Sequence, residues 1–110
     1  MQPISPQQLA HLVSTRQQQG AALPVLLDVR EPQEWAICRI EGSQLMPMQT
    51  VPVRLVELNP EQEIVCICHH GMRSAQVAHY LERNGFDNVL NLTGGVDAWA
   101  AQVDPAMPRY

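Results

Sequence analysis

The stretch Ile64-Val65-Cys66-Ile67-Cys68-His69-His70-Gly71-Met72-Arg73-Ser74 decides the fold of this 110-residue chain. Its first five residues are apolar and rich in β-branched side chains, as expected of a strand that is covered on both faces of a parallel sheet. The residues from His69 to Arg73 indicate a tight loop, and residues 74–84 indicate a helix that ends at Gly85. The sequence therefore predicts a strand–loop–helix unit with Cys68 at the carboxyl end of the strand.

The remaining elements alternate between strand and helix at short spacing, which predicts an α/β fold with a mostly parallel sheet. One domain is expected from the length. The predicted elements are a helix after Ser5 that ends at Gly20, a strand over 24–29, a short helix over 31–36, a strand over 43–46, a short helix over 53–58, a strand over 89–92, a helix over 96–102 and an irregular tail over 103–110.

Composition excludes several classes of function. The 7 basic and 11 acidic side chains give a net charge of −4, which disfavours nucleic-acid binding. No apolar stretch is long enough to cross a membrane, and the N-terminus lacks the features of a signal peptide. Three cysteines without disulfide-type spacing favour free thiols in a reducing compartment, so we expect a cytoplasmic protein.

Cys68 is the candidate chemical centre because of where it lies. Ligands of open α/β sheets collect beyond the carboxyl ends of strands. A tight loop that turns its N–H groups inward, followed by the positive end of a helix, favours a thiolate or a persulfide anion. Gly71 suits such a loop because it tolerates a positive φ. Cys66 and Cys38 are expected to be packing residues. The hypothesis requires that the Cys68 sulfur is not deeply enclosed.

The segment from Cys68 to Ser74 resembles the rhodanese active-site pattern Cys-x-x-Gly-x-Arg-Ser. Residues 26–32, with Leu-Leu-Asp-Val-Arg-Glu-Pro, are similar to the first block of that family, and residues 85–86 and 89–99 are similar to its last. The resemblance implies a rhodanese fold over residues 1–110, with a five-stranded, mostly parallel sheet and helices on both faces.

The same resemblance implies roles for individual residues. Cys68 would carry the transferred sulfur. Arg73 would either meet an anionic substrate or pair with a carboxylate. Asp28 would brace the site or cap a helix. The loop residues expected to hold the outer sulfur are His69, His70, Gly71, Met72 and Arg73, and the supporting residues are Asp28, Arg30 and Ser74.

Rhodanese-type chemistry is a two-step exchange in which a cysteine persulfide is the intermediate. The donor would be thiosulfate or a protein persulfide, and no metal or organic cofactor is needed. Thiosulfate-using members carry permanently cationic residues where this chain has His69 and His70, and neutral imidazoles attract a dianion less. The tail over 103–110 is similar to that of rhodanese domains fused to adenylating enzymes, which feed sulfur to carrier proteins. The expected partners are small sulfur donors and acceptors, sulfur-carrier proteins or a cysteine desulfurase.

Three alternatives remain open. Cysteine phosphatases and arsenate reductases use a similar loop, but they place five residues between cysteine and arginine, whereas four separate Cys68 from Arg73 here. A metal site could draw on Cys66, Cys68, His69 and His70, although no second ligand pair stands out. A silent rhodanese-like binding module typically loses the cysteine, which this chain keeps.

Overall fold

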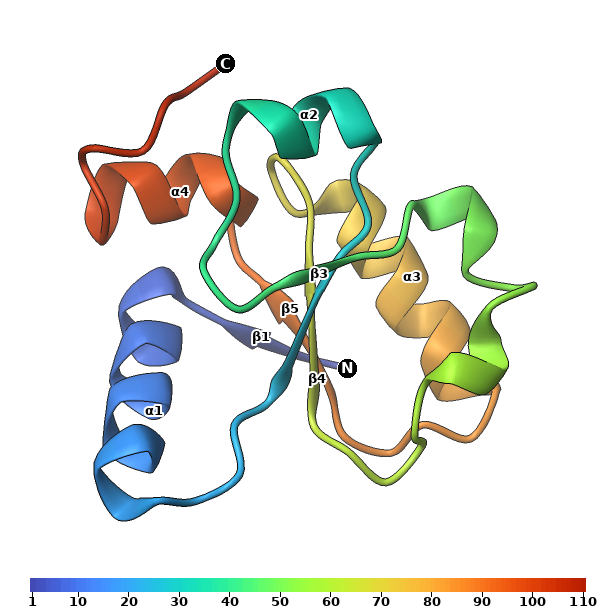
Figure 1. Cartoon of the computed structure of the whole chain (residues 1–110). Coiled ribbons are helices and arrows are strands. Elements are labelled where there is room, and N and C mark those ends of the chain that lie inside the picture. Colours follow the sequence, from blue (N-terminus) through green and yellow to red (C-terminus); the bar gives the residue numbers. More distant parts are fainter.

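The computed structural model describes all 110 residues and contains one five-stranded parallel sheet (Figure 1). The strand order is β1-β5-β4-β2-β3, and each neighbouring pair is parallel. The prediction of a five-stranded α/β fold is confirmed. The elements are β1 (Gln2–Ile4), α1 (Pro6–Gln19), β2 (Val25–Asp28), α2 (Pro32–Ile37), β3 (Gln44–Leu45), the 3-10 helices η1 (Met48–Thr50) and η2 (Leu55–Glu57), β4 (Ile64–Ile67), α3 (Met72–Arg83), β5 (Val89–Leu92) and α4 (Gly95–Gln102).

The sheet separates two apolar cores because successive side chains of a strand point to opposite faces. Cys66 of β4 packs on the face covered by α3, together with Leu81 of that helix. Val65 and Ile67 pack on the opposite face, where Leu9 of α1 also lies. Figure 1 shows α1 and α4 on one side of the sheet and α3 on the other. The central strand is therefore buried on both faces, as its uniformly apolar sequence predicts.

Three local features differ from the sequence-based prediction. The edge strand β1 was not expected, because its three residues, which include Pro3, are too few to show the alternation of apolar and polar side chains of a strand. These residues nevertheless pair with β5. Of the helix expected over 53–58, only the 3-10 helix η2 forms, and a second 3-10 helix, η1, precedes it; Pro52 lies between them without an N–H to continue a helical ladder. The helix α3 begins at Met72 rather than Ser74, directly after Gly71.

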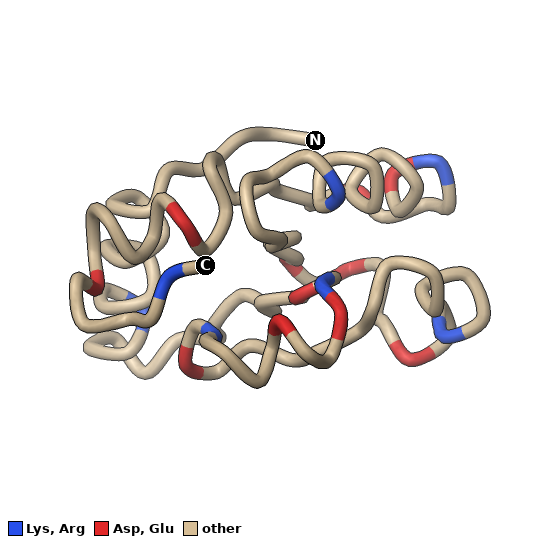
Figure 2. Tube along the Cα trace, turned by 90° about the horizontal axis from the view of Figure 1, so that it is seen from above, with Lys and Arg blue, Asp and Glu red and all other residues tan.

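Charged side chains are dispersed over the molecule, and five of the seven basic residues pair with a carboxylate. Figure 2 shows blue and red positions interspersed along the trace, without a face that is basic alone. None of the helices has the length and apolar character that crossing a bilayer requires. The five pairs are Arg16–Glu63, Arg30–Asp28, Arg54–Glu57, Arg73–Glu34 and Arg109–Asp97.

The start of α4 is bonded directly to the segment that follows β4. The Val96 N–H donates to the Cys68 carbonyl at 2.9 Å, and the Asp97 N–H donates to the His69 carbonyl at 3.1 Å. Gly95 makes this close approach possible: a Cβ there would lie 2.3 Å from the Cys68 carbonyl oxygen, and its φ is +61°. A side chain at this position would push the helix off the loop.

Replacing Gly95 by alanine is expected to destabilise the fold by about 3 kcal/mol, since a left-handed residue costs about 1–2 kcal/mol and an overpacked contact about 1–3 more. Gly20→Ala is the matched control, because Gly20 has a similar φ of +64° but nothing within 4 Å of its added Cβ. That control should lose only about 1 kcal/mol. Urea unfolding measures both, and equal losses would contradict the importance of the contact.

Candidate active site

Cys68 follows the last residue of β4, at the carboxyl edge of the sheet. Its Sγ accepts a hydrogen bond from the Gly71 N–H at 3.0 Å, which closes the loop between strand and helix around the sulfur. Gly71 has φ +104°, so the predicted need for a left-handed residue is met. The structure shows this one loop amide bonded to Sγ, where the sequence suggested a ring of them.

Ser74 supplies the second polar contact to the sulfur. Its Oγ lies 3.2 Å from the Cys68 Sγ and also donates to Oδ1 of Asn91, a residue of β5. The Asn91 Nδ2 in turn donates to the Gly71 carbonyl at 3.0 Å, which orients the amide. Because Ser74 is fully buried, its single hydroxyl proton is shared between two buried acceptors.

Arg73 closes the loop by pairing with Glu34 of α2. Its Nη1 and Nη2 lie 2.7 and 2.8 Å from the two Glu34 carboxylate oxygens, a bidentate geometry. This bond to Arg73 lowers the pKa of Glu34 to about 2, and the pKa of Arg73 is raised in return. Of the two roles that the sequence left open for Arg73, the structure shows the carboxylate pair.

Asp28 and Arg30 form an ion pair that is wholly removed from water. The Arg30 Nε and Nη2 donate to the Asp28 carboxylate at 2.9 and 2.8 Å, and Nη2 also donates to the Cys38 carbonyl at 2.7 Å. Burial opposes the charge of Arg30, but its bonds to Asp28 and Tyr110 raise its pKa overall. Asp28 does not cap α2, because Glu31 is the N-cap. Its carboxylate instead anchors Arg30.

The C-terminal residue Tyr110 lies over the loop. Its ring stacks on His69, with centroids 3.9 Å apart and planes inclined by 10°. Its hydroxyl accepts from Arg30 at 2.8 Å and donates to Glu34 at 2.8 Å. Burial, and then the neighbouring His70, lower the pKa of His69, so that its imidazole is neutral at pH 7. The His70 side chain is 62% exposed.

The three cysteines are all reduced and buried. Burial raises the pKa of the Cys66 thiol to about 12, which fits the expected packing role. Cys68 is itself only 1% exposed, so the expectation of an open thiol is wrong for this structure. The cause is the apolar core on the α3 face of the sheet, where Cys68 packs with Met46, Val51 and Val77. Almost none of this residue is therefore open to a dissolved reagent.

The expected site residues therefore fall into two connected groups. One surrounds the sulfur, and the other braces the loop from β2 and α2. Three expected residues belong to neither: Met72 and His70 are exposed, and His69 stacks on Tyr110. The first group is Cys68, Gly71 and Ser74, and the second is Asp28, Arg30 and Arg73.

Three contacts were missed because they come from distant segments. The sequence indicated a buried contact for Asn91, since an amide in the apolar strand β5 must find a buried partner. The indication for Glu34 was weaker and came from its place as the capping-box residue of α2, three positions after Glu31. Nothing in the sequence pattern of the tail indicates that Tyr110 folds back over the loop.

Comparison with known proteins gives a consistent result. Residues 5–102 match the model of the rhodanese-like domain family. The chain is 40% identical over 76 residues to a sulfurtransferase of Allochromatium vinosum, covering 69% of this chain and 71% of that protein. It is 38% identical over 87 residues to the probable adenylyltransferase/sulfurtransferase MoeZ of Mycobacterium tuberculosis, covering 77% of this chain and 22% of MoeZ.

Among solved structures, a rhodanese-like domain protein from Staphylococcus aureus superimposes with a TM-score of 0.81 at 30% identity, covering 100% of this chain and 99% of that one. The chain spans between 22% and 30% of the length of the longer curated relatives that it matches. The family match, the sulfurtransferase relatives and the shared fold agree with the strand–loop–helix unit around Cys68, and this chain belongs to the rhodanese-like domain family.

Proposed function

We propose that this protein transfers sulfane sulfur through a persulfide on Cys68. The observation that carries the proposal is the position of Sγ at the carboxyl end of β4, where it accepts from the Gly71 N–H at 3.0 Å and lies 3.2 Å from the Ser74 hydroxyl. Both groups are donors aimed at a site where negative charge develops on sulfur. Donors that are fixed in place before the reaction stabilise such charge without reorganisation.

The reaction has two steps that balance without an external oxidant. In the first, the Cys68 thiolate attacks the outer sulfur of the donor, one S–S bond forms and one breaks, and the donor leaves as a thiolate if it is a persulfide or as sulfite if it is thiosulfate. In the second, an acceptor thiolate attacks the outer sulfur of the Cys68 persulfide and regenerates the free cysteine. The site alternates between two covalent states, as ping-pong kinetics require.

The charges around the loop favour a protein persulfide over thiosulfate as the donor. The Arg73 guanidinium is neutralised by Glu34, and Arg30 is neutralised by Asp28. The neutral His69 adds no cation that would attract a dianion. A thiosulfate dianion therefore meets little uncompensated positive charge near the sulfur. The same pairing of Arg73 disfavours a phosphatase, because its arginine is not free to bind a phosphate.

The acceptor proposed here is a sulfur-carrier protein. Similarity to the adenylyltransferase/sulfurtransferase MoeZ supports this class of acceptor, as does the tail over 103–110. The enclosure of Cys68 counts against attack on a freely dissolved donor, so the proposal requires that a docked protein partner exposes the sulfur.

Incubation with a cysteine desulfurase and cysteine is expected to add the mass of one sulfur atom to Cys68, because the loop stabilises the persulfide anion. Intact-protein and peptide mass spectrometry would locate the addition. Cys68→Ser should lose it, whereas Cys66→Ser and Cys38→Ser should retain it, since both side chains are buried away from the loop. Labelling of Cys66 or Cys38, or of no residue with any donor, would overturn the proposal.

The neutralised arginine leads to a second expectation. Glu34→Gln should lower the KM for thiosulfate by roughly fivefold, which corresponds to about 1 kcal/mol of recovered attraction between Arg73 and the dianion. Glu57→Gln is the matched control, because it frees Arg54 in an exposed pair of the η2 segment. Steady-state kinetics with thiosulfate and cyanide would measure both variants. An unchanged or higher KM in Glu34→Gln would argue against the electrostatic explanation.

A further inference from the structure

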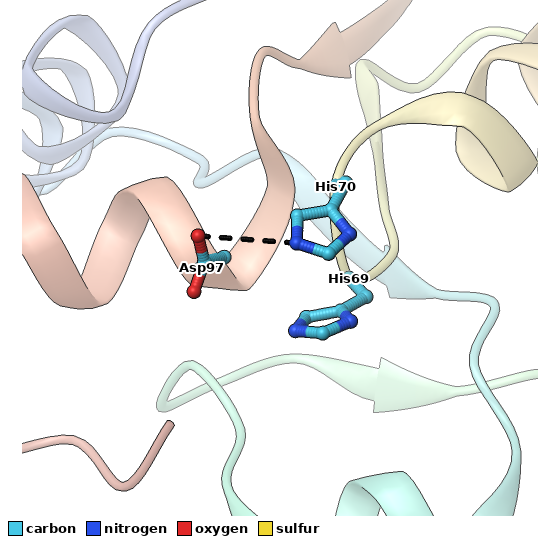
Figure 3. Close-up of side chains that lie close together, drawn as sticks. All are labelled: His69, His70 and Asp97. Carbon is cyan, nitrogen blue, oxygen red and sulfur yellow. Dashed lines mark ion pairs between the residues drawn. The ribbon is translucent and has the colours of Figure 1, made fainter. Parts of the chain in front are cut away.

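We propose that His69, His70 and Asp97 form a binding site for a divalent transition-metal ion, with Zn²⁺ as the ligand of reference, at the rim of the loop that carries Cys68. The ligand atoms of the three side chains all lie within 4.8 Å of one another. Figure 3 shows the two imidazole rings, from the loop after β4, facing the carboxylate from the first turn of α4.

His69 presents a nitrogen that lacks a partner. Its Nε2 is buried and makes no hydrogen bond within the protein. An ion would satisfy the lone pair that the fold leaves unused.

Asp97 and His70 complete the ligand set. The His70 Nε2 lies 3.9 Å from the Asp97 Oδ2. The other carboxylate oxygen, Oδ1, accepts from Arg109 at 3.0 and 3.1 Å, so Oδ2 is the atom turned to the imidazoles. The Asp97 N–H donates to the His69 carbonyl at 3.1 Å, which holds the two ligand-bearing segments in register. The scaffold is therefore fixed by the backbone and does not depend on the ion.

Binding of Zn²⁺ requires the donor atoms, which lie within 4.8 Å of one another, to move closer together. Metal–ligand bonds of about 2.0–2.2 Å in a tetrahedral site place neighbouring donor atoms roughly 3.3 Å apart. The two imidazole rings lie against each other, with centroids 3.8 Å apart, so the exposed His70 ring must turn to aim a nitrogen at the ion. Two imidazoles and one carboxylate suit Zn²⁺ better than Mg²⁺ or Ca²⁺, and they leave one coordination position open.

This ligand set differs from the one considered from the sequence, which included two cysteines. The Cys66 side chain is fully buried on the α3 face of the sheet, and the Cys68 Sγ is held by Gly71 and Ser74. The second segment that a metal site needs comes from α4, 27 residues after His70, where Asp97 lies. The sheet topology brings it to the loop.

The test is a Zn²⁺ titration against a chromophoric chelator, with metal-stripped protein that carries no affinity tag. Wild type should bind one ion, and His70→Ala and Asp97→Asn should each weaken binding by at least about tenfold. His70→Ala is the principal variant because this exposed side chain is not needed for folding. His79→Ala is the control, since His79 lies 3.6 Å from Glu82 and does not belong to the cluster, so this variant should bind Zn²⁺ as the wild type does.

The variant Cys68→Ser tests whether the Cys68 thiolate is one of the metal ligands. In the proposed site it is not, so this variant should bind Zn²⁺ with the affinity of the wild type. Co²⁺ substitution gives an independent reading: ligation by nitrogen and oxygen produces visible d–d bands without the near-ultraviolet band of a cobalt–thiolate bond. Loss of binding in Cys68→Ser, a thiolate band with Co²⁺, or unchanged affinity in His70→Ala would each overturn the assignment. Persulfide formation on Cys68 in metal-free protein would be unaffected by these outcomes, so the two proposals fail separately.

Discussion

The buried ion pair between Asp28 and Arg30 is the interaction on which the site depends. Neither side chain is exposed to water, and such a pair is stable only when its remaining donors are also satisfied. Arg30 meets that condition by reaching the Tyr110 hydroxyl, which donates in turn to Glu34. Glu34 then holds Arg73 at the start of α3. A continuous network of hydrogen bonds and ion pairs thus connects β2, through Tyr110 and α2, to α3, the helix that follows the Cys68 loop.

The sequence predicts the fold well where the signal is local. The apolar run of β4 and the turn at Gly71 are explicit in consecutive residues, and the structure contains both. The errors occur where local signals are weak or absent. The strand β1 has three residues, and only its pairing with β5 makes it a strand. The segment around Pro52 forms 3-10 turns because packing and proline geometry, rather than helical periodicity, decide its path.

The site shows the same division. Cys68, Gly71 and Ser74 lie within seven residues, so a pattern in the sequence finds them together. Asn91 and Tyr110 reach the loop from separate elements, and their contacts follow from topology rather than from spacing. The enclosure of the sulfur was also beyond a sequence pattern, since it results from how the core on the α3 face packs around Cys68. Sequence reasoning therefore identified the candidate sulfur atom but not the groups that enclose it.

The hydroxyl of Ser74 has one proton and two neighbours that accept it, the Cys68 sulfur and the Asn91 amide oxygen. An uncharged sulfur leaves that proton with the amide, whereas a negatively charged sulfur draws it away. The single proton of this hydroxyl therefore couples the charge on Cys68 to the strand β5, because a bond to the sulfur forms only at the expense of the bond to Asn91.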